Sequence, residues 1–131
     1  MIVIDPNSGV PVYRQLVEQV RFLIASGRLA GGDELPSTRT LSEQLGLNPM
    51  TVSKAYGLLE QDGVVQRRPG LPIIVAATTR EAADGARLEQ LRGLLGPAVT
   101  GTRQLGISTT RAVAEFRQLL ADQTAEEEHD R

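Results

Sequence analysis

The stretch from Leu35 to Gly70 constrains the fold most, because it contains the start and stop signals of two short helices in succession. The first helix is predicted after Pro36, where Ser37 can cap its exposed amides, and Gly46 is expected to end it. The second is predicted to begin at Pro49, because proline fits the first helical position, where its missing N–H would have no partner. Two helices joined by so short a turn are typical of a helix-turn-helix.

Apolar residues recur at helical spacing in both helices and define the expected core. Leu41 and Leu45 come from the first helix, Leu47 fills the turn, and Gly63 ends the second helix. The side chains of the second helix expected to face inward are Val52, Ala55, Tyr56 and Leu59. Its outer face is small and polar, as a helix that enters the major groove of DNA requires. This outer face consists of Met50, Thr51, Ser53, Lys54 and Gly57.

A β-hairpin, or wing, is expected after the second helix. The pattern predicts strands over residues 64–66 and 72–75, joined by a turn. The hairpin tip would then carry Arg67 and Arg68, which suit phosphates or a minor groove. Gly70 is the position where the backbone of this tip can approach DNA most closely.

Each of these features also has an explanation that does not involve DNA. An amphipathic helix pair with a short turn occurs in many folds that bind no nucleic acid. In that case Lys54 would form a surface ion pair with Glu60 or Asp62. Met50 would pack against a neighbouring helix, and the two arginines would be a solvated turn. The order of the signals along the chain favours DNA binding.

The residues from Val12 to Val75 resemble the winged helix-turn-helix domain of the GntR family of bacterial transcription regulators. The matching segments are Gly27-Arg28-Leu29, the run from Gly32 through Leu35-Pro36-Ser37-Thr38-Arg39 to Leu41, the run from Leu45 to Tyr56, Leu59-Glu60 and Asp62-Gly63. One run is similar to the YtrA-like subgroup in particular: Asn48-Pro49 before Thr51-Val52, followed by Lys54-Ala55-Tyr56.

This resemblance implies a transcription regulator whose second helix is the recognition helix. It places Arg39 against the DNA backbone or a base, where a guanidinium can form a bidentate phosphate contact. It assigns base contacts to the first turn of the recognition helix. The DNA-binding residues expected in all are Ser37, Arg39, Asn48, Pro49, Met50, Thr51, Ser53, Lys54, Arg67, Arg68 and Gly70.

The chain departs from the family pattern at two places. Pro49 and Met50 stand where many relatives have arginine or serine, so the bases that those relatives contact do not transfer to this chain. The wing of most members is a Gly-x-Gly followed by an aromatic residue and valine, and here it is Gly70-Leu71-Pro72-Ile73-Ile74-Val75. Wing insertion is therefore less strongly supported than helix insertion.

Helices are also predicted on both sides of this region. One over residues 11–26 should complete the core with Tyr13, Leu16, Val17, Val20, Leu23 and Ile24. A long amphipathic helix with a kink at Pro97 is expected to end at Gly106, and Ser108 can cap another that runs to about Asp122. Two helices cannot bury their apolar faces alone. They could fold back on the winged helix, but dimerisation is expected, because a two-helix hairpin after a DNA-binding domain more often dimerises and the resemblance also implies it. The expected dimerisation residues are Leu88, Leu91, Leu95, Val99, Leu105, Val113, Phe116, Leu119 and Leu120.

The expected fold class is therefore mainly α with a small β-hairpin. Residues 1–77 form a winged helix-turn-helix, residues 78–124 a two-helix dimerisation hairpin, and residues 125–131 a disordered acidic tail. Of the 131 residues, the first 77 contain seven basic and seven acidic residues, and the remainder seven and nine. The net charge of −2 thus arises in the second part. Because the expected DNA-binding part is neutral, this net charge argues against DNA binding less strongly than acidity spread over the whole chain would.

Several function classes are not expected. The chain has no cysteine, and its single histidine, His129, lies in the acidic tail, where a solvated end is favoured over a metal site. Neither a catalytic set nor a cofactor site emerges, so we expect no enzyme. The sequence also shows no membrane-spanning run and no signal peptide, which indicates a cytoplasmic protein.

The interpretation that follows is a homodimeric transcription regulator, a repressor, that binds an inverted-repeat operator in double-stranded DNA. An alternative is a protein-interaction module, in which the winged helix docks a protein and the C-terminal helices scaffold an assembly. A further interpretation keeps DNA binding and adds a small-molecule effector held between the C-terminal helices and the winged domain. The sequence distinguishes neither the effector nor the operator.

Overall fold

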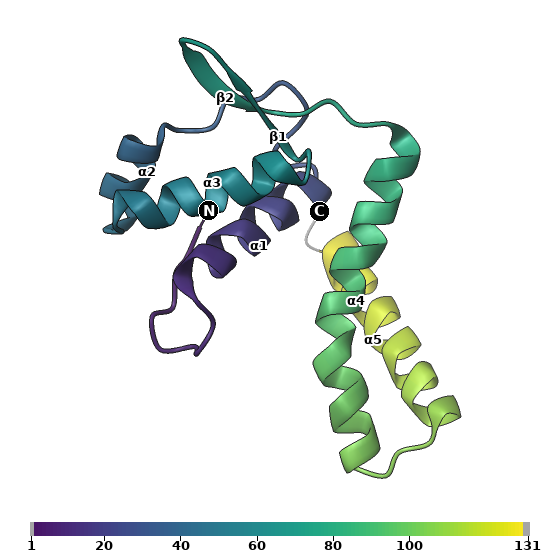
Figure 1. Cartoon of the computed structure of the whole chain (residues 1–131). Helices are drawn as coiled ribbons and strands as arrows, with labels where there is room; N and C mark the ends of the chain where they lie inside the picture. Colours follow the sequence, from purple (N-terminus) through teal and green to yellow (C-terminus); the bar gives the residue numbers. More distant parts are fainter. Residues whose placement is uncertain (1, 130–131) are drawn as a thin grey trace. The chain divides into compact units, whose positions relative to one another are not determined.

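The computed structural model describes residues 2–129 and confirms the expected fold class (Figure 1). Over those residues it contains five helices and one two-stranded antiparallel sheet. In chain order the elements are α1 (Val12–Ala25), α2 (Thr38–Leu45), α3 (Pro49–Gln61), β1 (Val65–Arg68), β2 (Leu71–Val75), α4 (Arg80–Gln104) and α5 (Thr109–His129). The chain divides into two compact units, Met1–Gln90 and Leu91–Arg131.

The first unit has one hydrophobic core, built where α3 packs against α1 and α2. The inward face of α3 is buried as predicted, and Val52, Ala55 and Leu59 have no exposed surface. Of the predicted α1 stripe, Leu16, Val17 and Val20 are buried in this core. Tyr13 and Ile24 are half-buried and pack against it, whereas Leu23 is half-buried and is not part of the core cluster. The other buried side chains of the core are Leu35, Leu41, Tyr56, Val65 and Val75.

Local capping chemistry fixes the helix-turn-helix as the sequence predicted. The Ser37 side chain accepts a hydrogen bond from the Thr40 amide at 3.0 Å and begins α2. Gly46 ends α2 with φ +66°, in the left-handed region that glycine adopts without strain. Asn48 caps α3, with its Oδ1 accepting from the Met50 amide at 2.8 Å.

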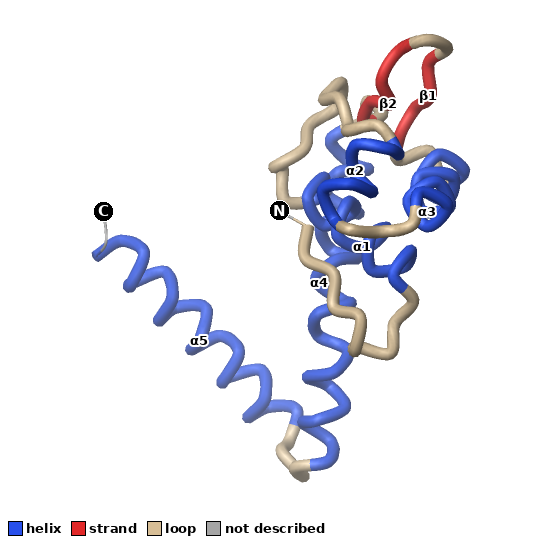
Figure 2. The backbone as a smooth tube through the Cα atoms, turned by 90° about the vertical axis from the view of Figure 1, so that its left-hand side faces the viewer, coloured by secondary structure: helices blue, strands red, loops and turns tan. Residues whose placement is uncertain are grey.

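The wing differs from the prediction in its tip. Residues 65–68 and 71–75 form the strands, so Pro69 and Gly70 alone make the turn (Figure 2). The expected tip position of Arg67 and Arg68 is wrong, because both lie within β1. The reason is that a proline followed by a glycine, here with φ +70°, suffices for a tight turn.

The other edge of β2 is covered by the segment that leads into α2. The Gly32 amide donates to the Val75 carbonyl and the Leu35 amide to the Ile73 carbonyl, both at 2.8 Å. The wing is therefore anchored to the helix-turn-helix through backbone hydrogen bonds as well as through the core.

The boundary between the units lies within α4, whereas the sequence indicated residue 77. The first turns of α4 belong with the winged helix because small side chains such as Ala82 and Ala86 face the same cavity as Ile24 and Ala25 of α1. Alanine contributes little to a hydrophobic periodicity, so the sequence pattern did not reveal this association.

Helix α5 extends beyond its predicted end near Asp122, to His129. The disorder predicted for residues 125–129 is therefore wrong, and residues 130 and 131 lie outside the described part of the chain. Alanine and glutamate are strong helix formers, which accounts for the continuation of the helix through Ala125 and Glu126–Glu128.

The second unit leaves its apolar side chains uncovered. Pro97 lies inside α4 as expected, and the Ser108 side chain accepts from the Arg111 amide at the start of α5. Figure 2 shows α5 diverging from the end of α4 instead of packing along it. Of the residues expected to dimerise, only Leu95 is half-buried, and the others are exposed.

Replacement of Tyr56 tests the core. The Tyr56 hydroxyl donates to the Pro36 carbonyl at 2.7 Å, and burial raises its pKa to about 12. We expect Tyr56→Phe to lower the free energy of unfolding by about 1 kcal/mol at pH 7, since one buried hydrogen bond is lost. Chemical denaturation followed by circular dichroism measures this change.

The same pair of proteins tests the tyrosine pKa. Between about pH 10 and 12 the unfolded chain loses the phenol proton while the folded chain keeps it, so wild-type stability falls as pH rises. Tyr56→Phe lacks this titration, and its stability should fall less steeply over that interval. Parallel stability profiles for the two proteins would contradict the assignment.

Candidate nucleic-acid interface

The exposed face of α3 begins at its first turn. Met50, Ser53 and Lys54 are exposed and Thr51 is half-buried, so these predicted recognition residues lie on the outer side of the helix. Met50 is 78% exposed, which rules out the alternative that it packs against a neighbouring helix. Short polar and flexible side chains here leave the helix slim enough to enter a major groove.

Asn48 has a structural task that limits its part in base recognition. Its Oδ1 is occupied by the Met50 amide. Bidentate recognition of adenine needs the oxygen and the nitrogen of an asparagine amide together. While Asn48 caps α3, its NH2 group is free for DNA, but its Oδ1 keeps only one of its two lone pairs and is held in the direction that the cap sets.

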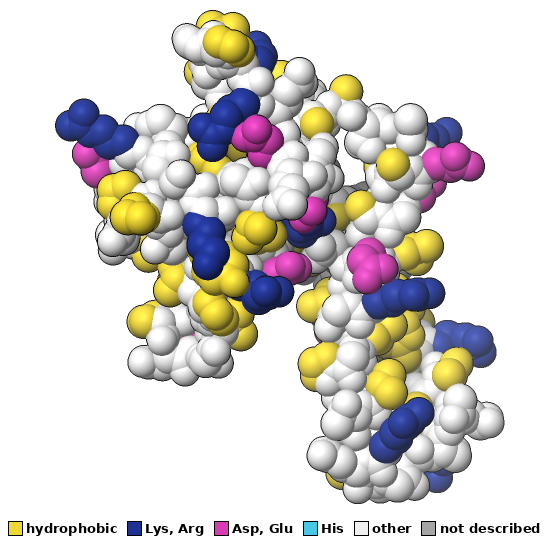
Figure 3. Space-filling view, in the orientation of Figure 1, with side chains coloured by type: hydrophobic (Ala, Val, Ile, Leu, Met, Phe, Trp, Pro, Cys, Tyr) yellow, Lys and Arg dark blue, Asp and Glu magenta, His cyan; other side chains and the backbone are white. Residues whose placement is uncertain are grey.

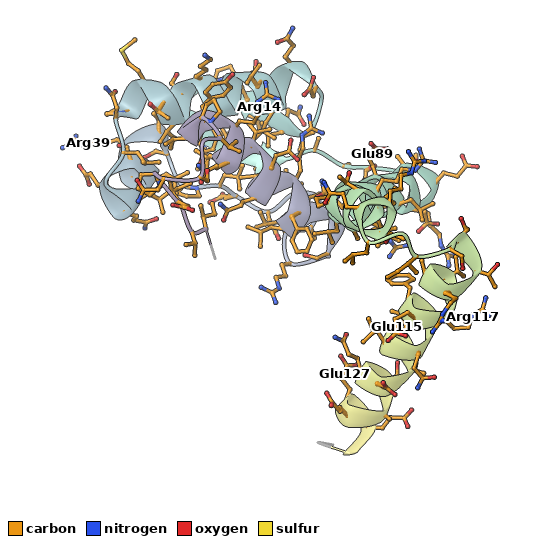
Figure 4. The ribbon with its side chains drawn as sticks, turned by 90° about the horizontal axis from the view of Figure 1, so that it is seen from below. Arg14, Arg39, Glu89, Glu115, Arg117 and Glu127 are labelled. Carbon is orange, nitrogen blue, oxygen red and sulfur yellow. The ribbon has the colours of Figure 1, made fainter. Side chains whose placement is uncertain are left out.

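Arg39 lies on α2 with its side chain 89% exposed. Its Nε donates to Glu43 Oε1 at 3.3 Å, one helical turn further along. Such an exposed pair contributes little, so the guanidinium can exchange this carboxylate for a phosphate at small cost. Figure 4 shows Arg39 projecting away from the ribbon of α2.

Lys54 lies above an aromatic ring of α1. Its Nζ is 3.9 Å from the centre of the Tyr13 ring, and the Arg14 guanidinium carbon is 5.9 Å from the same centre. A cation above a ring face is stabilised by about 0.5–1 kcal/mol at an exposed site. The alternative that Lys54 pairs with Glu60 or Asp62 is wrong.

Those two carboxylates have other partners. Asp62 forms an ion pair with Arg21 of α1, and Glu60 forms one with Arg67 at 2.6 Å. Sequence reasoning placed Tyr13 in the core and missed its contact with Lys54. Only the packing of α1 against α3 brings the two side chains together, so no local signal could have revealed it.

The wing arginines are held back by the protein itself. Arg67 is tied to the end of α3 through Glu60, and Arg68 Nη2 donates to the Pro72 carbonyl across the hairpin at 3.1 Å. The Arg68 Nε is buried and has no hydrogen-bond partner in the part of the chain that the structure describes. Gly70 is open at the tip, where an added Cβ would meet nothing within 4 Å.

The electrostatic character of the first unit is mixed. On the face shown in Figure 3, basic and acidic side chains lie among one another instead of forming one basic patch. The expected positive face of Arg39, Lys54, Arg67 and Arg68 is reduced because two of the four arginine and lysine side chains pair with carboxylates.

The first unit also contains a cavity of about 360 Å³ beside the Arg21–Asp62 ion pair. Alanine side chains form much of its wall, and Glu89 and Gln90 of α4 add polar groups. The small-molecule effector expected from the sequence stays a prediction. Within residues 2–129, no cluster of His, Cys, Asp or Glu could hold a metal ion, and no helix is long and apolar enough to cross a membrane.

Comparison with known proteins finds bacterial transcription regulators. Residues 12–75 match the family model described as bacterial regulatory proteins of the gntR family. The HTH-type transcriptional repressor YtrA of Bacillus subtilis is 29% identical over 93% of this chain and 94% of its own length.

Two solved structures extend the comparison. YtrA from Sulfolobus acidocaldarius, a GntR-family transcription factor, is 32% identical, with a TM-score of 0.57 over 92% of this chain and 97% of that one. The structure of AraR(DBD) in complex with operator ORX1 is 28% identical, with a TM-score of 0.51 over 56% of this chain and 92% of that one. The match of residues 12–75, together with whole-length relatives, shows that this chain belongs to the GntR family of DNA-binding transcription regulators and is YtrA-like within it.

Proposed function

We propose that this chain is a homodimeric repressor that binds an inverted-repeat operator through two copies of α3. The observation that most supports this proposal is the exposed first turn of α3, whose Met50, Ser53 and Lys54 stand free of the core. A helix presented in this way can enter a major groove, and a two-fold dimer suits a palindromic site. The similarity to a protein named as a repressor supports the direction of regulation.

Phosphate contacts and base contacts are expected to come from different side chains. Arg39 and Lys54 reach phosphates and position the protein, whereas Met50, Thr51 and Ser53 contact base edges. The relative AraR(DBD) was solved with operator DNA, which supports the use of this domain on a duplex. Such a regulator acts where bacterial DNA lies, in the cytoplasm.

The proposed dimer rests on the second unit. Apolar side chains of α4 and α5 are exposed along both helices, including Leu91, Val99, Phe116 and Leu120. Exposed apolar surface on this scale is unfavourable in water, and a second copy of the same hairpin would cover it. The rival function, a protein-interaction scaffold, would use the same surface for a different protein.

Removal of Arg39 tests the phosphate contact. Arg39→Ala should weaken binding to every DNA sequence and lower the slope of log affinity against log salt by about one per lost phosphate contact, or about two for a dimer. Fluorescence anisotropy across a salt series, with DNA from upstream of the protein's own gene and scrambled DNA, measures both effects.

Arg28→Ala is the control matched in charge. Arg28 is exposed and follows α1 in the chain. The Arg21–Asp62 ion pair joins the C-terminal part of α1 to the end of α3, so Arg28 lies away from the first turn of α3. It should leave affinity and slope nearly unchanged. If wild-type protein bound both DNAs equally and weakly, and Arg39→Ala made no difference, the scaffold function would be favoured.

Thr51→Ala tests base recognition. Because Thr51 lies on the recognition face of α3, its loss should change the ranking of DNA sequences more than their mean affinity. A panel of single-base variants of the bound DNA, measured by anisotropy, gives the ranking. Equal losses on every sequence from both Arg39→Ala and Thr51→Ala would contradict the division of roles.

A charge in the apolar face of α5 tests the dimer. We expect wild-type protein to sediment at twice the chain mass of 14.1 kDa, and Phe116→Glu to shift it toward the monomer because burying an unpaired carboxylate is costly. Ala114→Glu adds the same charge on the opposite side of α5 and should leave the dimer intact. A wild-type monomer at micromolar concentration would refute the dimer.

A further inference from the structure

Met50 is the most exposed large hydrophobic side chain in the described part of the chain, at 78%. It lies in the first turn of α3, the part of a recognition helix that reaches deepest into a groove. The buried and half-buried apolar residues of α3 all pack in the core or against it, whereas the Met50 side chain does not contact it. An apolar side chain held in water at this position gains free energy only when a partner covers it.

Several hydrogen-bonding groups next to Met50 are already used within the helix or are missing. Asn48 uses its Oδ1 to cap the helix, and Pro49 has no N–H. Thr51 is half-buried, and its amide donates to the Asn48 carbonyl at 3.0 Å. Met50 is therefore the one exposed large apolar side chain on the recognition face of α3, beside the NH2 group of Asn48 and the hydroxyl groups of Thr51 and Ser53.

A major groove contains one apolar group, the C5-methyl of thymine. The other groups that distinguish the base pairs there are hydrogen-bond donors and acceptors. The methionine chain is unbranched, flexible and polarisable, so it can adapt to a methyl group from several approach angles.

We infer that Met50 recognises thymine methyl groups in the operator, so that this chain selects its site partly by apolar contact. This inference rests on the proposed function, since it concerns the same helix in the same groove. It assigns a specific chemical group to the base contact, and it makes Met50 a specificity-determining residue whose action needs no hydrogen bond.

Replacement of thymidine by deoxyuridine isolates the methyl group. The DNA upstream of the protein's own gene is amplified with either thymidine or deoxyuridine triphosphate, and anisotropy gives the affinity of wild-type protein for both products. Loss of each covered methyl should weaken binding about four-fold, or about 15-fold when both half-sites contribute.

Variants of Met50 complete a double-mutant cycle. Met50→Ser should bind the thymidine DNA more weakly and lose the difference between the two DNAs, whereas Met50→Leu should retain the difference. Ser53→Ala, an exposed neighbour on the same helix, should also retain it. Met50 is exposed, so thermal denaturation should show each variant folded as wild type.

Equal wild-type affinity for the two DNAs, each bound more tightly than scrambled DNA, would overturn the methyl contact and leave the proposed function standing. A full difference in Met50→Ser would likewise overturn the assignment to Met50. Binding no tighter than to scrambled DNA would overturn the proposed function, and the methyl contact with it.

Discussion

The first unit depends on the burial of one face of α3. Val52, Tyr56 and Leu59 lie along that face, and α1, α2 and the wing all pack against it or bond to segments that do. The hydroxyl of Tyr56 also bonds the Pro36 carbonyl, which ties α3 to the residues that begin α2. Because the inner face is fixed in this way, the outer face of the same helix is presented in one orientation. A recognition surface needs that rigidity, since flexible groups lose conformational entropy on binding.

The charge of this domain sets how it can hold DNA. Glu43 and Glu60 form ion pairs with Arg39 and Arg67, so under the proposed function each arginine would exchange a carboxylate for a phosphate. Exposed pairs of this kind are weak, and the exchange costs little. The neighbouring carboxylates nevertheless reduce the attraction for DNA of arbitrary sequence. Under the proposed function, this balance would lower the affinity for DNA of arbitrary sequence and raise the share of the binding free energy that base contacts supply.

Local features of this structure could be predicted from the sequence, and those that depend on packing could not. The capping hydrogen bonds of Ser37 and Asn48 join residues no more than three positions apart in the chain. The family resemblance covered residues 12–75, the same region that the family model matches. Lys54 meets Tyr13 only because α1 packs against α3. The partners of the wing arginines depend on strand register, which includes an irregularity between Gln66 and Arg68. The unit boundary in α4 depends on alanines, which give little periodic signal.

The cap formed by Asn48 has a consequence for how this chain can diverge. A substitution at position 48 by a residue other than aspartate, serine or threonine would remove the hydrogen bond that begins α3, at a cost of about 1 kcal/mol, whatever it did for DNA. The side chain at position 50 packs against nothing in the core and lies in the same helical turn. Mutations there are almost free of a stability penalty. If Met50 contacts bases as inferred, descendants of one ancestral gene could acquire new operators through changes at position 50 while Asn48 stays the same. The fold and the recognised DNA sequence would then be inherited separately.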